Sequence, residues 1–145
     1  MSTVDVSVEI DIAAEPSDVA SVMFDPAREP EWMAAVKTVR AIDPGIKPGA
    51  RVSRTGSFMG RELAWTTEVV SFHFPHALTL RIVDGPFVGT VQYEIGRGSA
   101  GSVARIRNVG ELSKFGFLPK AMIEGPMRSA LSADLARLKA LVEAT

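Results

Sequence analysis

Residues 4–12 read VDVSVEIDI, so that every second residue is a valine or an isoleucine. The residues between them are two aspartates, one glutamate and one serine. Successive side chains of a β-strand point to opposite faces, and this alternation therefore predicts a strand with one apolar and one polar face. A half-buried strand of this kind is typical of an antiparallel sheet that packs one face on a core.

Two short helices are predicted after this strand. Pro16 suits the first turn of a helix, where its missing N–H costs nothing, and residues 17–24 place their apolar side chains on one side. Residues 25–26, Asp-Pro, end this helix because a residue before proline avoids the helical region. A second short helix is predicted over residues 30–36.

Short β-rich segments follow, separated by turn clusters such as Asp43-Pro44-Gly45 and Asp84-Gly85-Pro86. Regular turn signals between such segments indicate an antiparallel meander. A tight Met59-Gly60 link predicts a hairpin between two of the segments. The predicted strands are 38–42, 51–58, 61–72, 77–83, 88–95 and 103–112.

The C-terminal part returns to helical periodicity. Apolar residues recur every three or four positions, at Ile123, Met127, Leu131, Leu135, Leu138 and Val142. This spacing predicts one long amphipathic helix. We expect it to begin near Pro119 and to kink at Pro126, although a start at Pro126 itself is an alternative.

The element order predicts an α+β fold in a single domain that spans residues 1–145. A curved antiparallel sheet of about seven strands buries its concave face only if another element covers it. The C-terminal helix is the one predicted element long enough, and the two short helices between strands 1 and 2 close one end. This arrangement is a helix-grip fold.

Composition excludes several classes of function. The chain has 145 residues, a net charge of -1, no cysteine and two histidines. We therefore expect no metal site, no cofactor and no nucleic-acid partner. The start of the chain lacks a secretory signal and no apolar run approaches the ~20 residues that span a bilayer, so a cytoplasmic protein without integral membrane association is expected. Arginine outnumbers lysine, which favours a bacterial source.

Four segments resemble the Bet v 1-like, START-related superfamily (SRPBCC), in particular its polyketide cyclase/dehydrase-like branch. They are AAEPSDVASVMFDPAREPEWMAAV (13–36), GRELAWTTEVVSFHFPHALTLRI (60–82), DGPFVGTVQYEI (84–95) and LSADLARLKALVEA (131–144). The resemblance spans nearly the whole chain. It implies the helix-grip fold, with a cavity between the sheet and the C-terminal helix, but it does not select among cyclases, hydrolases, lipid carriers and co-chaperone domains.

Strand alternation places a set of apolar, hydroxyl, amide and indole side chains on the inner faces, a composition typical of small-molecule pockets. We expect Trp65 to stack on a planar ligand, and the Tyr93 phenol and the Asn108 amide to bind its polar groups. The alternative is that the same side chains fill an ordinary core and leave no cavity. The candidate ligand-binding residues are Trp32, Met33, Phe58, Trp65, Leu80, Tyr93, Asn108 and Met122.

Charged residues give no catalytic set. Glu62 and Glu68 lie on the parity opposite Trp65, so we expect them to face solvent or to pair across the sheet with Arg54 or Arg81. No residue can be assigned a catalytic role, and whether the protein is an enzyme stays open.

The leading hypothesis is a protein that binds a small hydrophobic or aromatic molecule, polyketide-like or lipid-like, between the sheet and the helix. A polyketide cyclase or dehydratase is the first alternative, with Tyr93, Asn108 or a histidine polarising a carbonyl or moving a proton. A co-chaperone-like interaction domain is the second. A homodimer is also compatible with the sequence.

Overall fold

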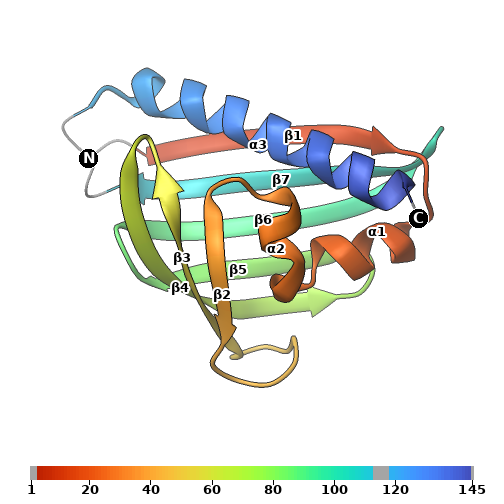
Figure 1. The fold of residues 1–145 in the computed structure, drawn as a ribbon, viewed down its shortest axis with the longest axis horizontal. Coiled ribbons are helices and arrows are strands. Elements are labelled where there is room, and N and C mark those ends of the chain that lie inside the picture. Colours follow the sequence, from red (N-terminus) through yellow and green to blue (C-terminus); the bar gives the residue numbers. More distant parts are fainter. Residues whose placement is uncertain (1–2, 113–117, 145) are drawn as a thin grey trace.

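The strands form one curved antiparallel sheet, and the long C-terminal helix lies along its concave side (Figure 1). The computed structural model describes residues 3–112 and 118–144. In chain order the elements are β1 (Thr3–Ile12), α1 (Pro16–Met23), the 3-10 helix η1 (Pro26–Arg28), α2 (Glu29–Trp32), β2 (Val36–Ala41), β3 (Arg51–Phe58), β4 (Arg61–His73), β5 (Ala77–Asp84), β6 (Phe87–Gly98), β7 (Gly101–Leu112) and α3 (Lys120–Glu143). The predicted α+β helix-grip fold is confirmed.

The sheet has the order β1-β7-β6-β5-β4-β3-β2, and each neighbouring pair is antiparallel. The first strand therefore pairs with the last one, with Val6 opposite Asn108. The predicted hairpin between β3 and β4 is also confirmed, because Phe58 pairs with Arg61 across Met59 and Gly60. Both turn residues have positive φ, 52° and 77°, the conformation that a two-residue hairpin turn requires.

The second short helix differs from its predicted range of residues 30–36. It is a single turn, and the chain is already extended at Met33, with φ -100° and ψ 108°. The physical reason lies in the next strand, because Ala35 accepts a hydrogen bond from the Ser57 N–H and Val36 pairs with Gly56. These sheet contacts end the helix early.

Side chains of α3 bind the open edge of β1. The Asp5 N–H donates to Glu124, the Ala13 N–H donates to Glu143, and Lys139 Nζ donates to the Asp11 carbonyl oxygen. An edge strand leaves backbone groups unpaired, and these contacts satisfy two of them on β1 and the N–H of Ala13, the residue after the strand. They also fix the helix lengthwise over the sheet. None of the helices in the described ranges combines the length and apolar content needed to cross a membrane.

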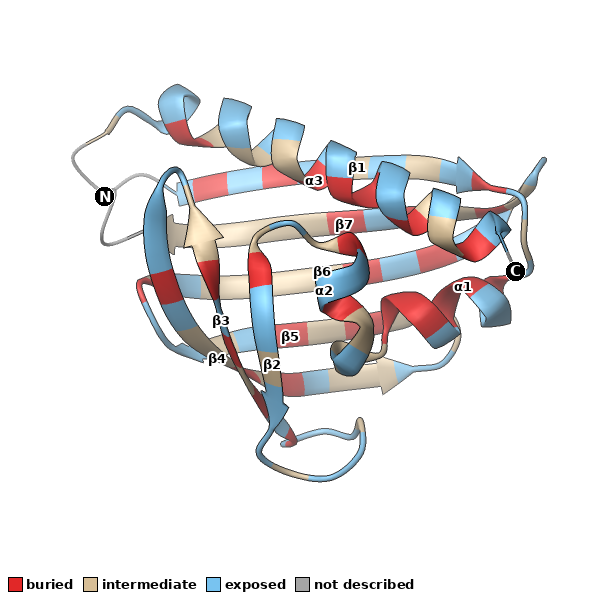
Figure 2. Ribbon diagram, in the orientation of Figure 1, coloured by how far each residue is buried: buried red, intermediate tan, exposed pale blue. Residues whose placement is uncertain are grey.

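The core lies between the concave face of the sheet, α1 and the inner side of α3 (Figure 2). Along α3 the buried apolar residues are Ile123, Leu131, Leu135, Leu138 and Val142, which are five of the six residues in the predicted stripe. Helical periodicity alone therefore identified the face of α3 that packs on the sheet.

Candidate functional site

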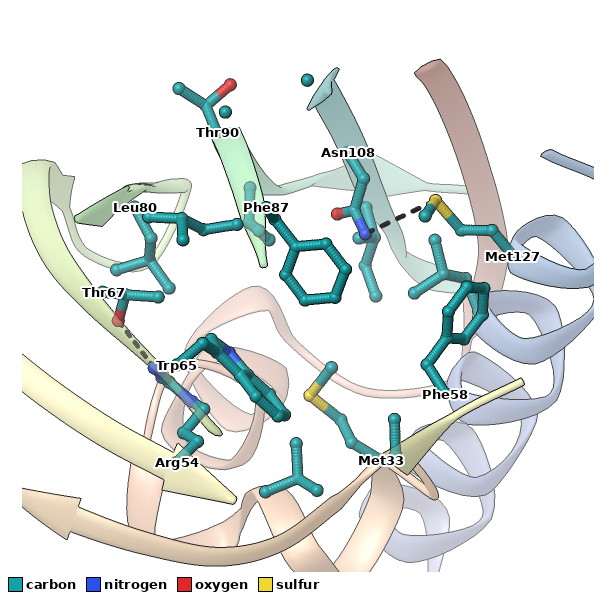
Figure 3. Close-up of a pocket in the computed structure, with 18 of the residues that line it drawn as sticks. Met33, Arg54, Phe58, Trp65, Thr67, Leu80, Phe87, Thr90, Asn108 and Met127 are labelled. Atoms are coloured by element: carbon teal, nitrogen blue, oxygen red, sulfur yellow. Dashed lines mark hydrogen bonds between the residues drawn. The ribbon is translucent and has the colours of Figure 1, made fainter. Parts of the chain in front are cut away.

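A cavity of about 160 Å³ lies between the concave face of the sheet and α3. Its walls come from all seven strands, from α2 and the loop after it, and from α3, and most of its side chains are apolar (Figure 3). The larger apolar side chains of the lining are Val4, Met33, Val36, Phe58, Leu63, Trp65, Leu80, Ile82, Phe87, Val88, Val91, Ile106, Val109, Met127 and Leu131.

Two glycines form part of the wall on β6 and β7. Gly89 and Gly110 pair directly across these strands and both line the cavity. A Cβ on Gly89 would lie 2.1 Å from the Val109 carbonyl oxygen, and a Cβ on Gly110 would lie 2.1 Å from the Val88 carbonyl oxygen. Glycine is therefore required at both positions, and this part of the wall carries no side chain.

Asn108 presents an amide to the cavity from the middle of β7 (Figure 3). Its Nδ2 donates a weak hydrogen bond to Met127 Sδ at 4.0 Å. Its Oδ1 is buried and has no hydrogen-bond partner among the described residues. An enclosed acceptor without a donor is unfavourable, because its hydration has been lost and not replaced.

Tyr93 lies deeper, on β6. Its hydroxyl donates to Met33 Sδ at 3.8 Å, and its ring stacks on Phe24 and meets the edge of Trp32. Burial raises the pKa of Tyr93 far above its usual value, so the phenol stays protonated at physiological pH. Both polar tips expected in the cavity are therefore present, and among the described residues their hydrogen bonds go to thioether sulfurs, which are weak acceptors.

A buried ion pair closes one side of the cavity. Arg54 on β3 donates to both carboxylate oxygens of Glu29 on α2, at 2.6 and 2.7 Å, and to the Thr67 hydroxyl at 2.6 Å. Burial acts to lower the pKa of Arg54, but the hydrogen bonds to Glu29 and the attraction of its charge together raise the pKa above its usual value. The guanidinium therefore stays charged, and the Glu29 carboxylate lies beside it as its counterion.

A second pair ties α3 to the loop that follows α2. Asp134, buried at the cavity, accepts the Ala34 N–H and pairs with Arg137. Arg137 also donates to the Trp32 carbonyl oxygen at 3.0 Å. Burial raises the pKa of Asp134 above its usual value, although the Ala34 N–H and the Arg137 charge oppose this shift.

Arg137→Ala is expected to reduce the free energy of unfolding by about 1–2 kcal/mol, because the Trp32 carbonyl loses a donor and Asp134 loses its counterion. The arginine is partly exposed, and solvent screening keeps the effect below that of a fully buried pair. Urea unfolding at neutral pH measures it. Arg128→Ala, at an exposed position of the same helix, should cost about 0.5 kcal/mol or less. Equal losses would show that the Arg137 contacts contribute nothing.

The structure brings six of the eight candidate residues to the cavity: Met33, Phe58, Trp65, Leu80, Tyr93 and Asn108. Trp32 is fully buried beside Tyr93 but does not line the cavity, because its ring packs into the core. Met122 is 54% exposed and points away, since it lies about 100° around the helix from the buried Ile123. Met127 takes the place expected for Met122. Trp32 and Met122 both lie outside the strands, where the alternation of side chains does not predict which way a residue points.

The charged residues of the cavity were not identified from the sequence. Glu68 pairs with Arg81, which is one of the partners expected for it. Arg54, the other expected partner, faces inward and pairs with Glu29. One signal was present, because Arg54 shares the parity of Val52 and Gly56, both buried on β3. Asp134 similarly adjoins Leu135 on the buried side of α3.

The two histidines lie at the end of β4 and in the turn that follows it. His73 and His76 lie outside the cavity lining, and His76 Nδ1 lies 3.0 Å from the Ile95 carbonyl oxygen. Neither the end of β4, which carries His73, nor the β4–β5 turn, which carries His76, is part of the cavity wall, so the structure gives no support to a histidine that polarises a bound carbonyl.

Solved structures share this fold at low sequence identity. Protein TTHA0849 from Thermus thermophilus superposes with a TM-score of 0.82 at 19% identity, with 97% of each chain covered. Protein CV1439 from Chromobacterium violaceum gives 0.70 at 16% identity, covering 96% of this chain and 97% of that one. The major latex-like protein 151 from Panax ginseng gives 0.75 at 11% identity, covering 95% and 96%.

No curated protein matches the sequence. The family model described as polyketide cyclase / dehydrase and lipid transport matches residues 3–143, nearly the whole length. The chain therefore belongs to the polyketide cyclase / dehydrase and lipid transport family.

Proposed function

We propose that this protein binds a small, largely apolar ligand, polyketide-like or lipid-like, in the cavity between its sheet and α3. The observation that carries the proposal is the cavity itself, about 160 Å³ in volume, with mainly apolar walls. An engineered apolar cavity of about 150 Å³ in another protein holds a benzene molecule. One aromatic ring therefore matches the volume, and a larger ligand needs the flexible thioethers of Met33 and Met127 to move.

Binding has better support than catalysis. Four charged side chains line the cavity, and three of them, Glu29, Arg54 and Asp134, are held in ion pairs; Glu111 is the fourth. A general acid or base must be able to exchange a proton with the ligand, whereas Glu29 is bonded through both oxygens to Arg54, and Asp134 accepts from Ala34 and Arg137. The description of the family also names polyketides and lipids, which are largely apolar molecules.

A cavity-filling substitution tests the proposal. Ala130 lines the cavity from α3, and a phenyl ring at this position would occupy much of the space that the ligand needs. Ala130→Phe is expected to weaken the binding of ethylbenzene by about tenfold or more, measured by isothermal titration calorimetry. Trp65 lies in the wall, so its fluorescence gives a second reading of the same binding.

Ala133→Phe is the matched control. Ala133 is exposed on the same helix and lies outside the lining, so the same chemical change should leave ethylbenzene binding unaltered. A wild-type protein that binds no apolar aromatic compound contradicts the proposed function. Equal binding by Ala130→Phe and Ala133→Phe would place the ligand elsewhere on the molecule.

A further inference from the structure

The polar groups of the cavity define what kind of ligand it accepts. Asn108 Nδ2 faces Met127 Sδ, and a thioether sulfur only accepts hydrogen bonds. The nitrogen is therefore the end of the amide that belongs on that side. The oxygen remains on the other side, buried and without a donor among the described residues. It calls for a hydrogen-bond donor on the ligand.

The charges of the cavity argue against an anionic ligand. Among the described lining residues Arg54 is the one basic side chain, and its nitrogens already donate to Glu29 and Thr67. Asp134 and Glu111 also belong to the lining and are acidic. A carboxylate on the ligand would lose its hydration without gaining a counterion, which is strongly unfavourable in an apolar site.

Two aromatic rings give the cavity a surface for a planar molecule. Trp65 on β4 and Phe87 on β6 meet edge to face, with ring centroids 6.4 Å apart and planes at 77°. Figure 3 shows both rings at the cavity, with the Asn108 amide beyond Phe87. Aromatic side chains attract a ring in stacked or edge-to-face contact.

We propose that the ligand is a neutral aromatic molecule with a hydroxyl group, and that this hydroxyl donates its hydrogen bond to Asn108 Oδ1. The inference rests on the proposed function, since it names the chemical class that the same cavity selects. It assigns Asn108 as the residue that discriminates ligands with a donor from ligands of similar shape without one. Trp65 and Phe87 contact the ring in either case.

Four compounds of similar size test this by isothermal titration calorimetry at pH 7: 4-ethylphenol, 4-ethylanisole, ethylbenzene and 4-ethylbenzoate. The phenol should bind the wild-type protein about tenfold more tightly than the anisole and ethylbenzene, because only the phenol supplies a donor to the buried oxygen. The benzoate should bind most weakly of the four. This series needs no variant, so it is independent of any effect of substitution on folding.

Asn108→Leu should remove the preference for the phenol and leave the binding of ethylbenzene within about twofold of wild type. Gln92→Leu is the matched control. It makes the same change from amide to leucine on the neighbouring strand β6, outside the cavity lining, and should keep the preference.

The outcomes separate the two proposals. If all three neutral compounds bind equally, or if the benzoate binds most tightly, the role of Asn108 is refuted while ligand binding in the cavity stands. If Asn108→Leu keeps the preference for the phenol, the donor is recognised by another residue and the inference is wrong. If none of the compounds binds, the proposed function fails and this inference fails with it.

Discussion

Arg54→Met is expected to reduce the free energy of unfolding by about 3–5 kcal/mol. The arginine and its partner Glu29 have side chains only 3% and 4% exposed, and the two are joined by two hydrogen bonds. Removing the guanidinium leaves the carboxylate buried without a counterion, and the Thr67 hydroxyl loses its donor. Urea unfolding at pH 7, followed by circular dichroism, measures the loss.

Two further variants isolate the ion pair from the rest of the strand. The double variant Glu29→Leu/Arg54→Met removes both charges and should recover most of the stability, since a buried pair replaced by apolar groups is often close to neutral. Arg51 lies on the same strand as Arg54 and forms an exposed ion pair with Asp43. Arg51→Met breaks this pair and should reduce the free energy of unfolding by about 1 kcal/mol or less. Similar losses for Arg54→Met and Arg51→Met would show that burial of the pair has no energetic weight.

This ion pair shows where sequence reasoning reached its limit. The position of Arg54 on β3 follows from alternation, because Val52 and Gly56 share its face. A charged side chain is usually exposed to solvent, so the charge of Arg54 predicts the opposite orientation. The buried position is explained by its ion pair with Glu29. That partner lies 25 residues earlier, on a helix of one turn. No local pattern relates the two positions, so the pairing depends on how α2 packs against the sheet.

The part of the cavity built by strands was more accessible to prediction. In a half-buried strand, the direction of a side chain follows from its parity, which is a local property of the sequence. Trp65, Leu80, Tyr93 and Asn108 reach the cavity for this reason, each from a different strand. The volume left between them is not local, since it depends on the curvature of the sheet and on the height of α3.

The helical residues of the site illustrate the same contrast. Met127 belongs to the apolar stripe of α3 and lines the cavity, whereas Met122 lies off that stripe and is exposed. Periodicity separates the two methionines correctly when it is applied without exception. Trp32 was misplaced for another reason, because an aromatic ring next to a pocket and one in the core give the same sequence pattern.

Leu135→Ala is expected to reduce the free energy of unfolding by about 2–5 kcal/mol, through lost burial and the cavity left behind. Leu135 is 1% exposed and belongs to the core between α3 and the sheet. The side chains of Glu124, Lys139 and Glu143 bind the backbone of β1 and of Ala13, and these contacts oppose a movement of the helix into the space. Limited collapse puts the cost in the upper part of this range.

Met122→Ala on the same helix provides the comparison, because it also shortens an apolar side chain. Met122 is 54% exposed, so Met122→Ala should reduce the free energy of unfolding by about 0.5 kcal/mol or less in the same urea experiment. The ratio of the two losses measures how strongly one face of α3 is held against the sheet. Losses of equal size would mean that α3 does not cover the concave face in solution. The cavity between helix and sheet would then be open to solvent on that side.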